Sequence, residues 1–392
     1  MRALAYFGQN DVRFTTDLKE PVISADDELI IAVSYCGICG TDLKEYTEGA
    51  IFFPPDGGHN EISGNGLPQA MGHEISGVVE KVGKGCKTFK VGDHVVVEPT
   101  GTCKDRYRWP ESQNANKPMC SACSIGMTNI CAHLALCGAG LESGGFAERL
   151  VINEAHVHKI PDHMPLDIGA LIQPISVCWH AVKVAHYKKG GSALIIGGGP
   201  IGLGTILALK GFGCEYIVLS EPATIRREYA GKMGAKVYDP TGVPFDESVK
   251  TLREMGPNGD GFDYTFDCSG LPITLNAAIE CCTFRGTAVN VAVWNNKPVE
   301  FYPMDITHQE KRYTGSMCYT SEDFEEVIDA FETDKIDIAS ASHMITNKVP
   351  IEDGVDGAIM RLLNDKGHVI KILLTPNNNG ELRDRRPVEL NV

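Results

Sequence analysis

The chain has 392 residues, and because one domain usually contains roughly 100 to 200 residues we expect two domains. Hydrophobic residues make up 43% and charged residues 22% of the chain, values that exclude a disordered or fibrous protein. The formal net charge of −15 argues against nucleic acid or an anionic membrane as partner and favours a small neutral substrate.

The first thirty residues carry charged side chains throughout, so they lack the apolar core of a signal peptide. No later apolar run is long enough to span a membrane. These two observations predict a cytosolic protein. The chain has 14 cysteines, which we expect to be reduced in that compartment and therefore available as metal ligands.

Two regions of different pattern follow each other along the chain. Up to about residue 161, short Val- and Ile-rich runs such as 28–36 and 92–99 alternate with glycines and charges, which predicts an antiparallel, barrel-like region. From 192 to 222 the order is apolar strand, glycine turn, amphipathic helix and second apolar strand. Further strands are expected at 262–270 and 286–294, so this second region predicts a doubly wound parallel sheet.

The second region begins with a dinucleotide-binding pattern. Gly197, Gly199 and Gly202, with Pro200 and Ile201 between the last two, form G-x-G-x-x-G directly after an apolar strand. The first glycine permits a tight turn, the second lets the backbone approach a pyrophosphate, and the third lets the helix pack on the strand. A plain glycine turn is the alternative, and the strand and helix on either side argue against it.

Glu221 ends the next predicted strand, where an acid would accept hydrogen bonds from the ribose hydroxyls of adenosine. A carboxylate there would repel a 2′-phosphate, so the pattern favours NAD over NADP. Arg226 follows on the next helix and is either a contact to the adenosine edge or a solvated surface arginine.

Four cysteines in the first region have the spacing of a structural zinc site. Cys120, Cys123 and Cys131 form C-x2-C-x7-C in a loop, and Cys103 is the fourth candidate. Four thiolates would close a tetrahedral zinc site and leave no position open for substrate. A redox C-x-x-C is the rival interpretation of Cys120 and Cys123, but no strand-to-helix redox turn surrounds them.

A second, looser group consists of Cys39, in CGICGTD, and His73, in MGHEISG. One thiolate and one imidazole would leave room for an oxygen ligand and an open position, as a catalytic zinc requires. By spacing alone, an ordinary buried histidine is an equal alternative for His73.

The stretch GHEISGVVEKVGKGCKTFKVGDHVVV, residues 72 to 97, resembles the signature of the medium-chain, zinc-dependent alcohol and polyol dehydrogenases. The resemblance covers nearly the whole chain. Within the family the chain is most similar to fungal 2,3-butanediol dehydrogenase-like proteins, through the extended loop at 51–70, the wide gap between Cys103 and Cys120, and the PNNNG segment.

The resemblance implies an α/β protein with two domains: a GroES-like β-barrel catalytic domain at 1–165, completed by 320–392, and an NAD-binding Rossmann domain at 166–319. It also implies a homo-oligomer, dimer or tetramer. The implied reaction passes a hydride between a secondary alcohol, such as a vicinal diol or polyol, and NAD, with zinc as Lewis acid.

The resemblance assigns the catalytic zinc to Cys39 and His73, with Glu74 as a direct or exchangeable ligand. A further ligand is normally an acid in an E-P-L-S-V segment, but this chain has Gln173 there. An amide oxygen can still bind zinc, and it removes one negative charge from the site. Thr41 matches the hydroxyl residue that accepts the alcohol proton, whereas Lys44 stands where a histidine usually continues the proton relay.

Two rival functions remain open on the sequence alone. One is a zinc-free quinone or enone reductase on the same scaffold, which the cysteine loop and the G-H-E residues disfavour. The other is an NAD-binding structural or regulatory homologue with impaired catalysis, which Gln173 and Lys44 keep open.

Overall fold

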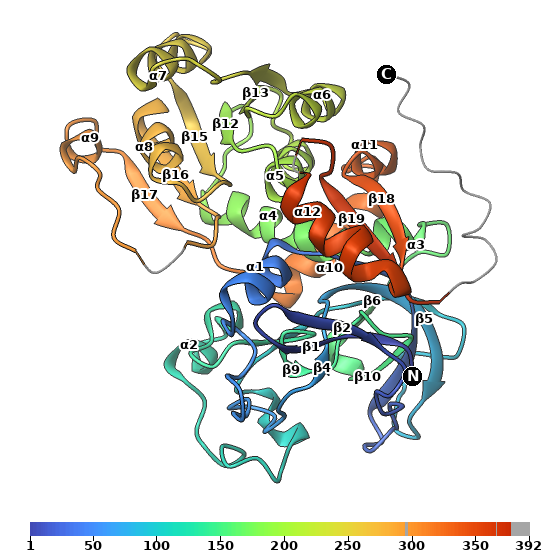
Figure 1. Cartoon of the computed structure of the whole chain (residues 1–392). Coiled ribbons are helices and arrows are strands. Elements are labelled where there is room, and N and C mark those ends of the chain that lie inside the picture. The colour runs from blue at the N-terminus through green and yellow to red at the C-terminus, as the bar shows by residue number, and fades with distance from the viewer. Residues whose placement is uncertain (295–296, 366, 378–392) are drawn as a thin grey trace. The chain divides into compact units, whose positions relative to one another are not determined.

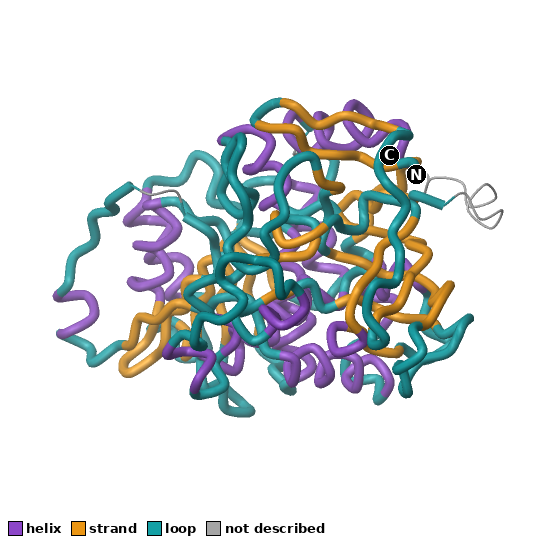
Figure 2. The backbone as a smooth tube through the Cα atoms, turned by 90° about the horizontal axis from the view of Figure 1, so that it is seen from below, coloured by secondary structure: helices purple, strands orange, loops and turns teal. Residues whose placement is uncertain are grey.

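The computed structural model describes residues 1–294, 297–365 and 367–377 (Figure 1). The chain divides into two compact units: unit 1 comprises Met1–Gln173 and Ile345–Val392, and unit 2 comprises Pro174–Met344. No helix in the described part of the chain is both long and apolar enough to cross a membrane. The course of the helices and strands along the backbone can be followed in Figure 2.

Unit 1 is built mainly from antiparallel strands. Its strands are β1 (Ala3–Gly8), β2 (Asp11–Thr15), β3 (Glu28–Gly37), β4 (Gln69–Ala70), β5 (Glu74–Val82), β6 (His94–Val97), β7 (Thr100–Gly101), β8 (Ala135–Cys137), β9 (Gly140–Glu142), β10 (Arg149–Asn153), β11 (Val157–Lys159), β18 (Ile345–Pro350) and β19 (Lys371–Thr375). Its helices are α1 (Gly40–Glu48), α2 (Ser121–Ser124), α3 (Leu166–Gly169) and α12 (Arg361–Asn364), and further helical turns include a π-helical segment at Gly354–Met360.

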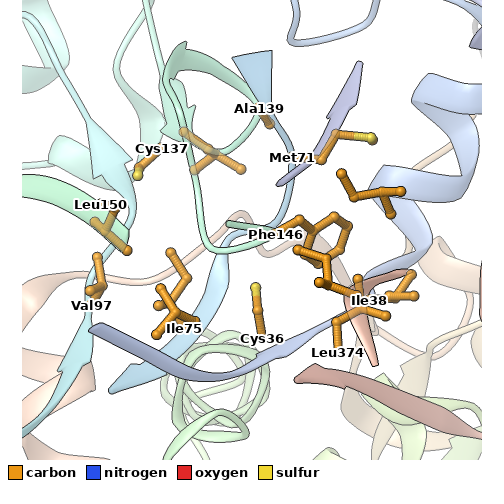
Figure 3. Close-up of a cluster of buried hydrophobic side chains, with 14 of the residues drawn as sticks. Cys36, Ile38, Met71, Ile75, Val97, Cys137, Ala139, Phe146, Leu150 and Leu374 are labelled. Atoms are coloured by element: carbon orange, nitrogen blue, oxygen red, sulfur yellow. The ribbon is translucent and has the colours of Figure 1, made fainter. Parts of the chain in front are cut away.

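The largest sheet of unit 1 has the strand order β11-β6-β5-β3-β19-β18, and β10 also pairs with β3. Apolar side chains alternate inward along these strands, as expected for a sheet with one buried face. Figure 3 shows Cys36, Ile75, Val97, Leu150 and Leu374, from five different strands, converging on one core. This core fixes the strand ends that carry the candidate ligands.

Unit 2 contains a six-stranded sheet in which every pairing is parallel, in the order β14-β13-β12-β15-β16-β17. Its strands are β12 (Ala193–Ile196), β13 (Ile217–Ser220), β14 (Lys236–Tyr238), β15 (Phe262–Asp267), β16 (Cys282–Asn290) and β17 (Arg312–Gly315). Its helices are α5 (Pro200–Gly211), α6 (Thr224–Lys232), α7 (Phe245–Glu254), α8 (Pro272–Cys281), α9 (Met304–Thr307), α10 (Ser321–Glu332) and α11 (Ile338–Ser342), while α4 (Ile172–Val184) begins at the boundary with unit 1.

This strand order is that of a dinucleotide-binding sheet, because it reverses direction between β12 and β15. Continuous apolar strands such as ALII in β12 are fully buried, as expected for strands covered by helices on both faces.

The segment around α10 packs within unit 2. Lys183 of α4 donates to Asp323 and Glu326 of α10 at 2.8 Å and 2.9 Å. Trp179 Nε1 donates to Glu326 at 2.6 Å. These polar contacts attach α10 to α4, and the second boundary between the two compact units follows Met344.

Candidate active site

Cys103, Cys120, Cys123 and Cys131 come together in unit 1, and we call them the cysteine lobe. Their four Sγ atoms all lie within 4.8 Å of one another. Cys120 Sγ and Cys131 Sγ are 3.9 Å apart, close to the separation of about 3.8 Å that four sulfurs at roughly 2.3 Å from a tetrahedral zinc would have. The residues present therefore fit a closed zinc site.

Backbone N–H groups point at the sulfurs of the cysteine lobe. Cys120 N donates to Cys103 Sγ at 3.3 Å, and Cys123 N donates to Cys120 Sγ at 3.4 Å. Hydrogen bonds from the backbone of Ala132 and Cys123 lower the pKa of Cys120 to about 6. Such donors stabilise thiolates, the form in which cysteine binds metal.

The second candidate site begins at the N-terminus of α1. Cys39 precedes the helix, and its backbone N–H donates to Asp42 Oδ2 at 2.8 Å. The Cys39 Sγ lies 3.7 Å from the hydroxyl of Thr41. This turn therefore holds a thiol and a hydroxyl on the same side of the first helical turn.

His73 faces the same turn from the segment before β5. Its Nδ1 lies 3.5 Å from Asp42 Oδ1, and both side chains are buried. Neither atom makes a regular hydrogen bond within the described part of the chain. Burial alone would lower the pKa of His73, but the nearby Asp42 and Cys39 raise it well above its usual value.

We call Cys39, Asp42 and His73 the metal corner. A carboxylate behind the imidazole of a metal-binding histidine is a common arrangement, since it fixes the ring and increases its basicity. The two unpartnered buried atoms and the adjacent thiol fit a metal cation that would bind Cys39 and His73 while Asp42 orients the imidazole.

Glu74 is held by a different partner. Lys371 Nζ of β19 donates to both carboxylate oxygens, at 2.6 Å and 2.8 Å, and to the carbonyl of Ile38 at 2.9 Å. Glu74 and Lys371 are both fully buried. A Cβ on Gly37 would lie 1.9 Å from Glu74 Oε2, so only glycine leaves room for this ion pair. In the structure, therefore, the Glu74 carboxylate is bound to Lys371.

The remaining predicted residues lie on two helices, α1 of unit 1 and α4 at the boundary between the units. Gln173 is buried and occupies the second position of α4, and Lys44 is half-buried on α1. Among the described residues, only the cysteine lobe brings three or more Cys, His or acidic ligand atoms within 4.8 Å of one another. Cys39, His73 and Glu74 do not form such a group in the described part of the chain, and Glu74 pairs with Lys371 instead.

Unit 2 has the expected glycine turn at residues 197–202, which we call the nucleotide turn. Gly197 has φ +102°, a conformation that favours glycine. A Cβ on Gly202 would lie 1.8 Å from the carbonyl oxygen of Gly197. Gly199 precedes Pro200, the first residue of α5, and the N–H groups of Ile201 and Gly202 are those of the first helical turn that can bind a phosphate.

Glu221 and Arg226 lie beside the nucleotide turn. Glu221 is buried and accepts hydrogen bonds from the N–H groups of Gly198 at 2.6 Å and Ala223 at 2.8 Å. Arg226 Nη1 lies 3.8 Å from Glu221 Oε2. The structure thus brings the acid, the arginine and the glycines together at the carboxyl end of β13.

Sequence analysis did not identify Asp42 or Lys371. A signal for Asp42 was present, because an acid three residues after Cys39 can cap the helix and reach a neighbouring ligand. No local signal identifies Lys371, which is 297 positions away from Glu74.

Two family models match the chain. The alcohol dehydrogenase GroES-like domain matches residues 25–162, and the zinc-binding dehydrogenase domain matches residues 200–333. The chain belongs to the zinc-dependent medium-chain dehydrogenases. It is accordingly an oxidoreductase that acts on CH–OH donors, and the predicted GroES-like and Rossmann architecture is confirmed.

Curated relatives support this membership over almost the full length. The probable diacetyl reductase 2, (R)-acetoin forming, of Saccharomyces cerevisiae is 65% identical over 97% of this chain and 92% of its own. The (R,R)-butanediol dehydrogenase of the same organism is 49% identical over 98% of this chain and 100% of its own.

Solved structures show the same architecture. The 2R,3R-butanediol dehydrogenase of Bacillus subtilis superposes with a TM-score of 0.83 at 32% identity, covering 96% of this chain and 99% of that one. An alcohol dehydrogenase of Escherichia coli CFT073, solved with its cofactor NADH, superposes with a TM-score of 0.78 at 25% identity, covering 96% of this chain and 99% of that one. The family membership disfavours both rival functions, the zinc-free reductase and the impaired homologue.

Proposed function

We propose that this dehydrogenase interconverts a vicinal diol of the 2,3-butanediol type with its hydroxyketone, and uses NAD as hydride acceptor. The observation that carries the proposal is the metal corner in a chain that is 65% identical to a diacetyl reductase and 49% identical to a butanediol dehydrogenase. The substrates of these relatives share one skeleton with two neighbouring oxygens.

Cys39, His73 and Gln173 are the residues we propose to hold the catalytic zinc. When bound, the metal would act as a Lewis acid that polarises the substrate oxygen. Asp42 fixes the imidazole of His73 from behind, at 3.5 Å. Lys371 holds the Glu74 carboxylate and compensates its charge, so that Glu74 is an exchangeable ligand only if it leaves this ion pair.

Thr41 is the residue we propose to accept the substrate hydroxyl proton, because its hydroxyl lies next to the Cys39 thiol. Lys44 lies one helical turn after Gly40 and is the residue we propose as the next step of the relay. The alternative is that Lys44 is a half-buried cation that balances the negative charges of the acidic residues on α1.

Glu221 supports NAD as the cofactor. Its carboxylate is already oriented by two backbone N–H groups, and it would accept hydrogen bonds from ribose hydroxyls while repelling a 2′-phosphate. We assign Arg226 to the adenosine edge of the same site, since its guanidinium lies 3.8 Å from Glu221 and beside the glycines.

The test measures zinc per chain, together with NADH formation on (2R,3R)-, meso- and (2S,3S)-butanediol, with 2-butanol as the control that lacks the second hydroxyl. We expect two zincs per chain and turnover of at least one diol well above that of 2-butanol, with NAD preferred over NADP. One zinc with intact NAD binding and no turnover would instead indicate a homologue without catalysis. Zinc-independent reduction of an enone would indicate the reductase.

We also propose a cytosolic homo-oligomer that associates through unit 2. Strand β17 is an edge of the six-stranded sheet, and exposed apolar side chains occur on β16, on β17 and in the segment that precedes β17. These side chains are Phe284, Phe301, Tyr302, Met304 and Tyr313. An uncovered edge strand with apolar neighbours is a natural site for pairing with a second copy.

A further inference from the structure

Asp267 is the last residue of β15, and its position is set by two parallel neighbours. In the register of the sheet it lies beside Ile196, which directly precedes the nucleotide turn, and beside Asn290, which ends β16. Ligands of such sheets bind at the carboxyl ends of the strands, where the strand order reverses. Asp267 therefore occupies this edge of the sheet.

The side chain of Asp267 holds the loop that follows β15. Its Oδ1 accepts the N–H groups of Ser269 at 3.0 Å and Gly270 at 3.2 Å. The loop in turn contacts the nucleotide turn, since a Cβ on Gly197 would lie 2.2 Å from Ser269 Oγ. Ser269 Oγ also donates to the carbonyl of Ile196 at 3.3 Å.

The backbone of Asp267 holds a second loop. Its carbonyl oxygen accepts the N–H groups of Val291 at 3.0 Å and Ala292 at 3.2 Å, directly after β16. Asp267 thus fixes both the loop after β15 and the loop after β16. Both loops lie at the carboxyl edge of the sheet, where ligands bind.

The carboxyl group of Asp267 is buried, and no cation among the described residues pairs with it. The residue is 0% exposed, and its Oδ2 has no hydrogen-bond partner among the described residues. The nearby hydroxyl of Thr274 donates to the carbonyl of Leu271 at 2.9 Å. Burial raises the pKa of the Asp267 carboxyl, and the N–H groups of Ser269 and Gly270 oppose that shift. A buried carboxyl group with an unpaired oxygen costs free energy in the fold and usually has a functional reason.

The strand order of the sheet reverses between β12 and β15. The adenosine half and the nicotinamide half of the cofactor can be assigned to opposite sides of this point. Glu221 at the end of β13 marks the adenosine side, so the nicotinamide side falls to β15 and β16. The nicotinamide ring carries a positive charge in NAD⁺ and none in NADH. A fixed negative charge on that side would stabilise the oxidised form selectively.

We propose that Asp267 is a positioning residue for the nicotinamide side of the cofactor site, and that its buried charge makes the protein bind NAD⁺ more tightly, relative to NADH, than it otherwise would. This inference rests on the proposed use of NAD. The proposed effect of Asp267 is on the ratio of the Kd for NAD⁺ to the Kd for NADH. It is not on whether the protein binds NAD.

The test compares the Kd values of NAD⁺ and NADH for the wild-type holoenzyme and for Asp267→Asn, measured by calorimetry. Asparagine keeps the Oδ1 acceptor for Ser269 and Gly270 and removes the charge. We expect Asp267→Asn to weaken NAD⁺ binding by about tenfold and to change NADH binding by less than about threefold. Equal effects on both forms, or no effect on either, would overturn the inference.

Asp263→Asn is the matched control, because Asp263 lies on the same strand and accepts hydrogen bonds from Ser192 N and Ser192 Oγ, both at 2.8 Å, away from the carboxyl edge. It should leave the ratio of the two Kd values unchanged. Asp267→Glu keeps the charge and should keep the ratio even if it weakens both forms, so a changed ratio there counts against the inference. A wild-type protein that binds neither form would refute the proposed use of NAD as well.

Discussion

Asp42 contributes to the metal corner through both of its carboxylate oxygens. Oδ2 fixes the backbone of Cys39, and Oδ1 faces Nδ1 of His73. The residue thus connects the two candidate ligands that are supplied by separate segments of unit 1. We propose that it would act on a bound metal through both of them, without being a ligand itself.

Replacing Asp42 by Asn should therefore weaken zinc binding at the metal corner by about 10- to 100-fold, the usual effect of losing a partner of a ligand histidine. Competition with a chromophoric chelator measures this affinity, and zinc in the cysteine lobe should remain bound. Glu48→Gln is the control, since Glu48 is exposed on the same helix. Equal zinc affinity in Asp42→Asn and Glu48→Gln would contradict the assigned role.

The Glu74–Lys371 pair has consequences for stability. Lys371→Met leaves the Glu74 charge buried without a partner and should lower the free energy of unfolding by about 3–5 kcal/mol. Adding Glu74→Gln should restore much of that loss. Urea unfolding measures both changes. Lys335→Met removes an exposed pair with Asp329 and should cost less than about 1 kcal/mol, so a similar cost for both lysines would refute this account.

The candidate ligands were identifiable from the sequence, whereas their supporting partners were not. Cys39, His73 and the four lobe cysteines stand in recognisable spacings or signatures. Lys371 had no such signal, because its role depends on the tertiary pairing of β19 with β3 rather than on neighbours in sequence. The family resemblance implied that Glu74 is a ligand, and only the folded structure reveals the lysine that neutralises it.

Close backbone contacts leave no space for an added side chain in the nucleotide turn. Gly202→Ala would place a methyl group 1.8 Å from the carbonyl of Gly197, so the turn must open and NADH binding should be lost. NADH fluorescence titration measures this loss. Gly231→Ala on α6 has open space around the new Cβ and should leave NADH binding unchanged while adding about 0.5–1 kcal/mol of stability. NADH binding by Gly202→Ala at wild-type affinity would refute the proposed site.

Regular elements were predicted more reliably than their assignment to a unit. The strand–turn–helix order from 192 to 222 follows directly from apolar periodicity and glycines. Helix α10 falls in the segment 320–392, which the resemblance assigned to the catalytic domain. Its membership of unit 2 depends on Lys183 and Trp179 of α4, and such a pairing of distant side chains has no signature in a single sequence.

The association of whole molecules can be tested at the β17 edge. Tyr313 is 39% exposed on this strand, and Tyr313→Asp would place a charge in the proposed contact. We expect the mass measured by light scattering after size-exclusion chromatography to fall towards that of one chain. Tyr107→Asp changes a 61% exposed tyrosine of unit 1 and should leave the mass unchanged. An unchanged mass for Tyr313→Asp would exclude association through this edge.

The position of β19 in the sheet of unit 1 constrains the order in which the molecule can be made. β19 lies between β3 and β18, yet it follows the whole of unit 2 in the sequence. During synthesis, the N-terminal strands emerge from the ribosome long before Lys371 does. Until then Glu74 has no cation to pair with, so unit 1 can reach its final form only after unit 2 has been translated.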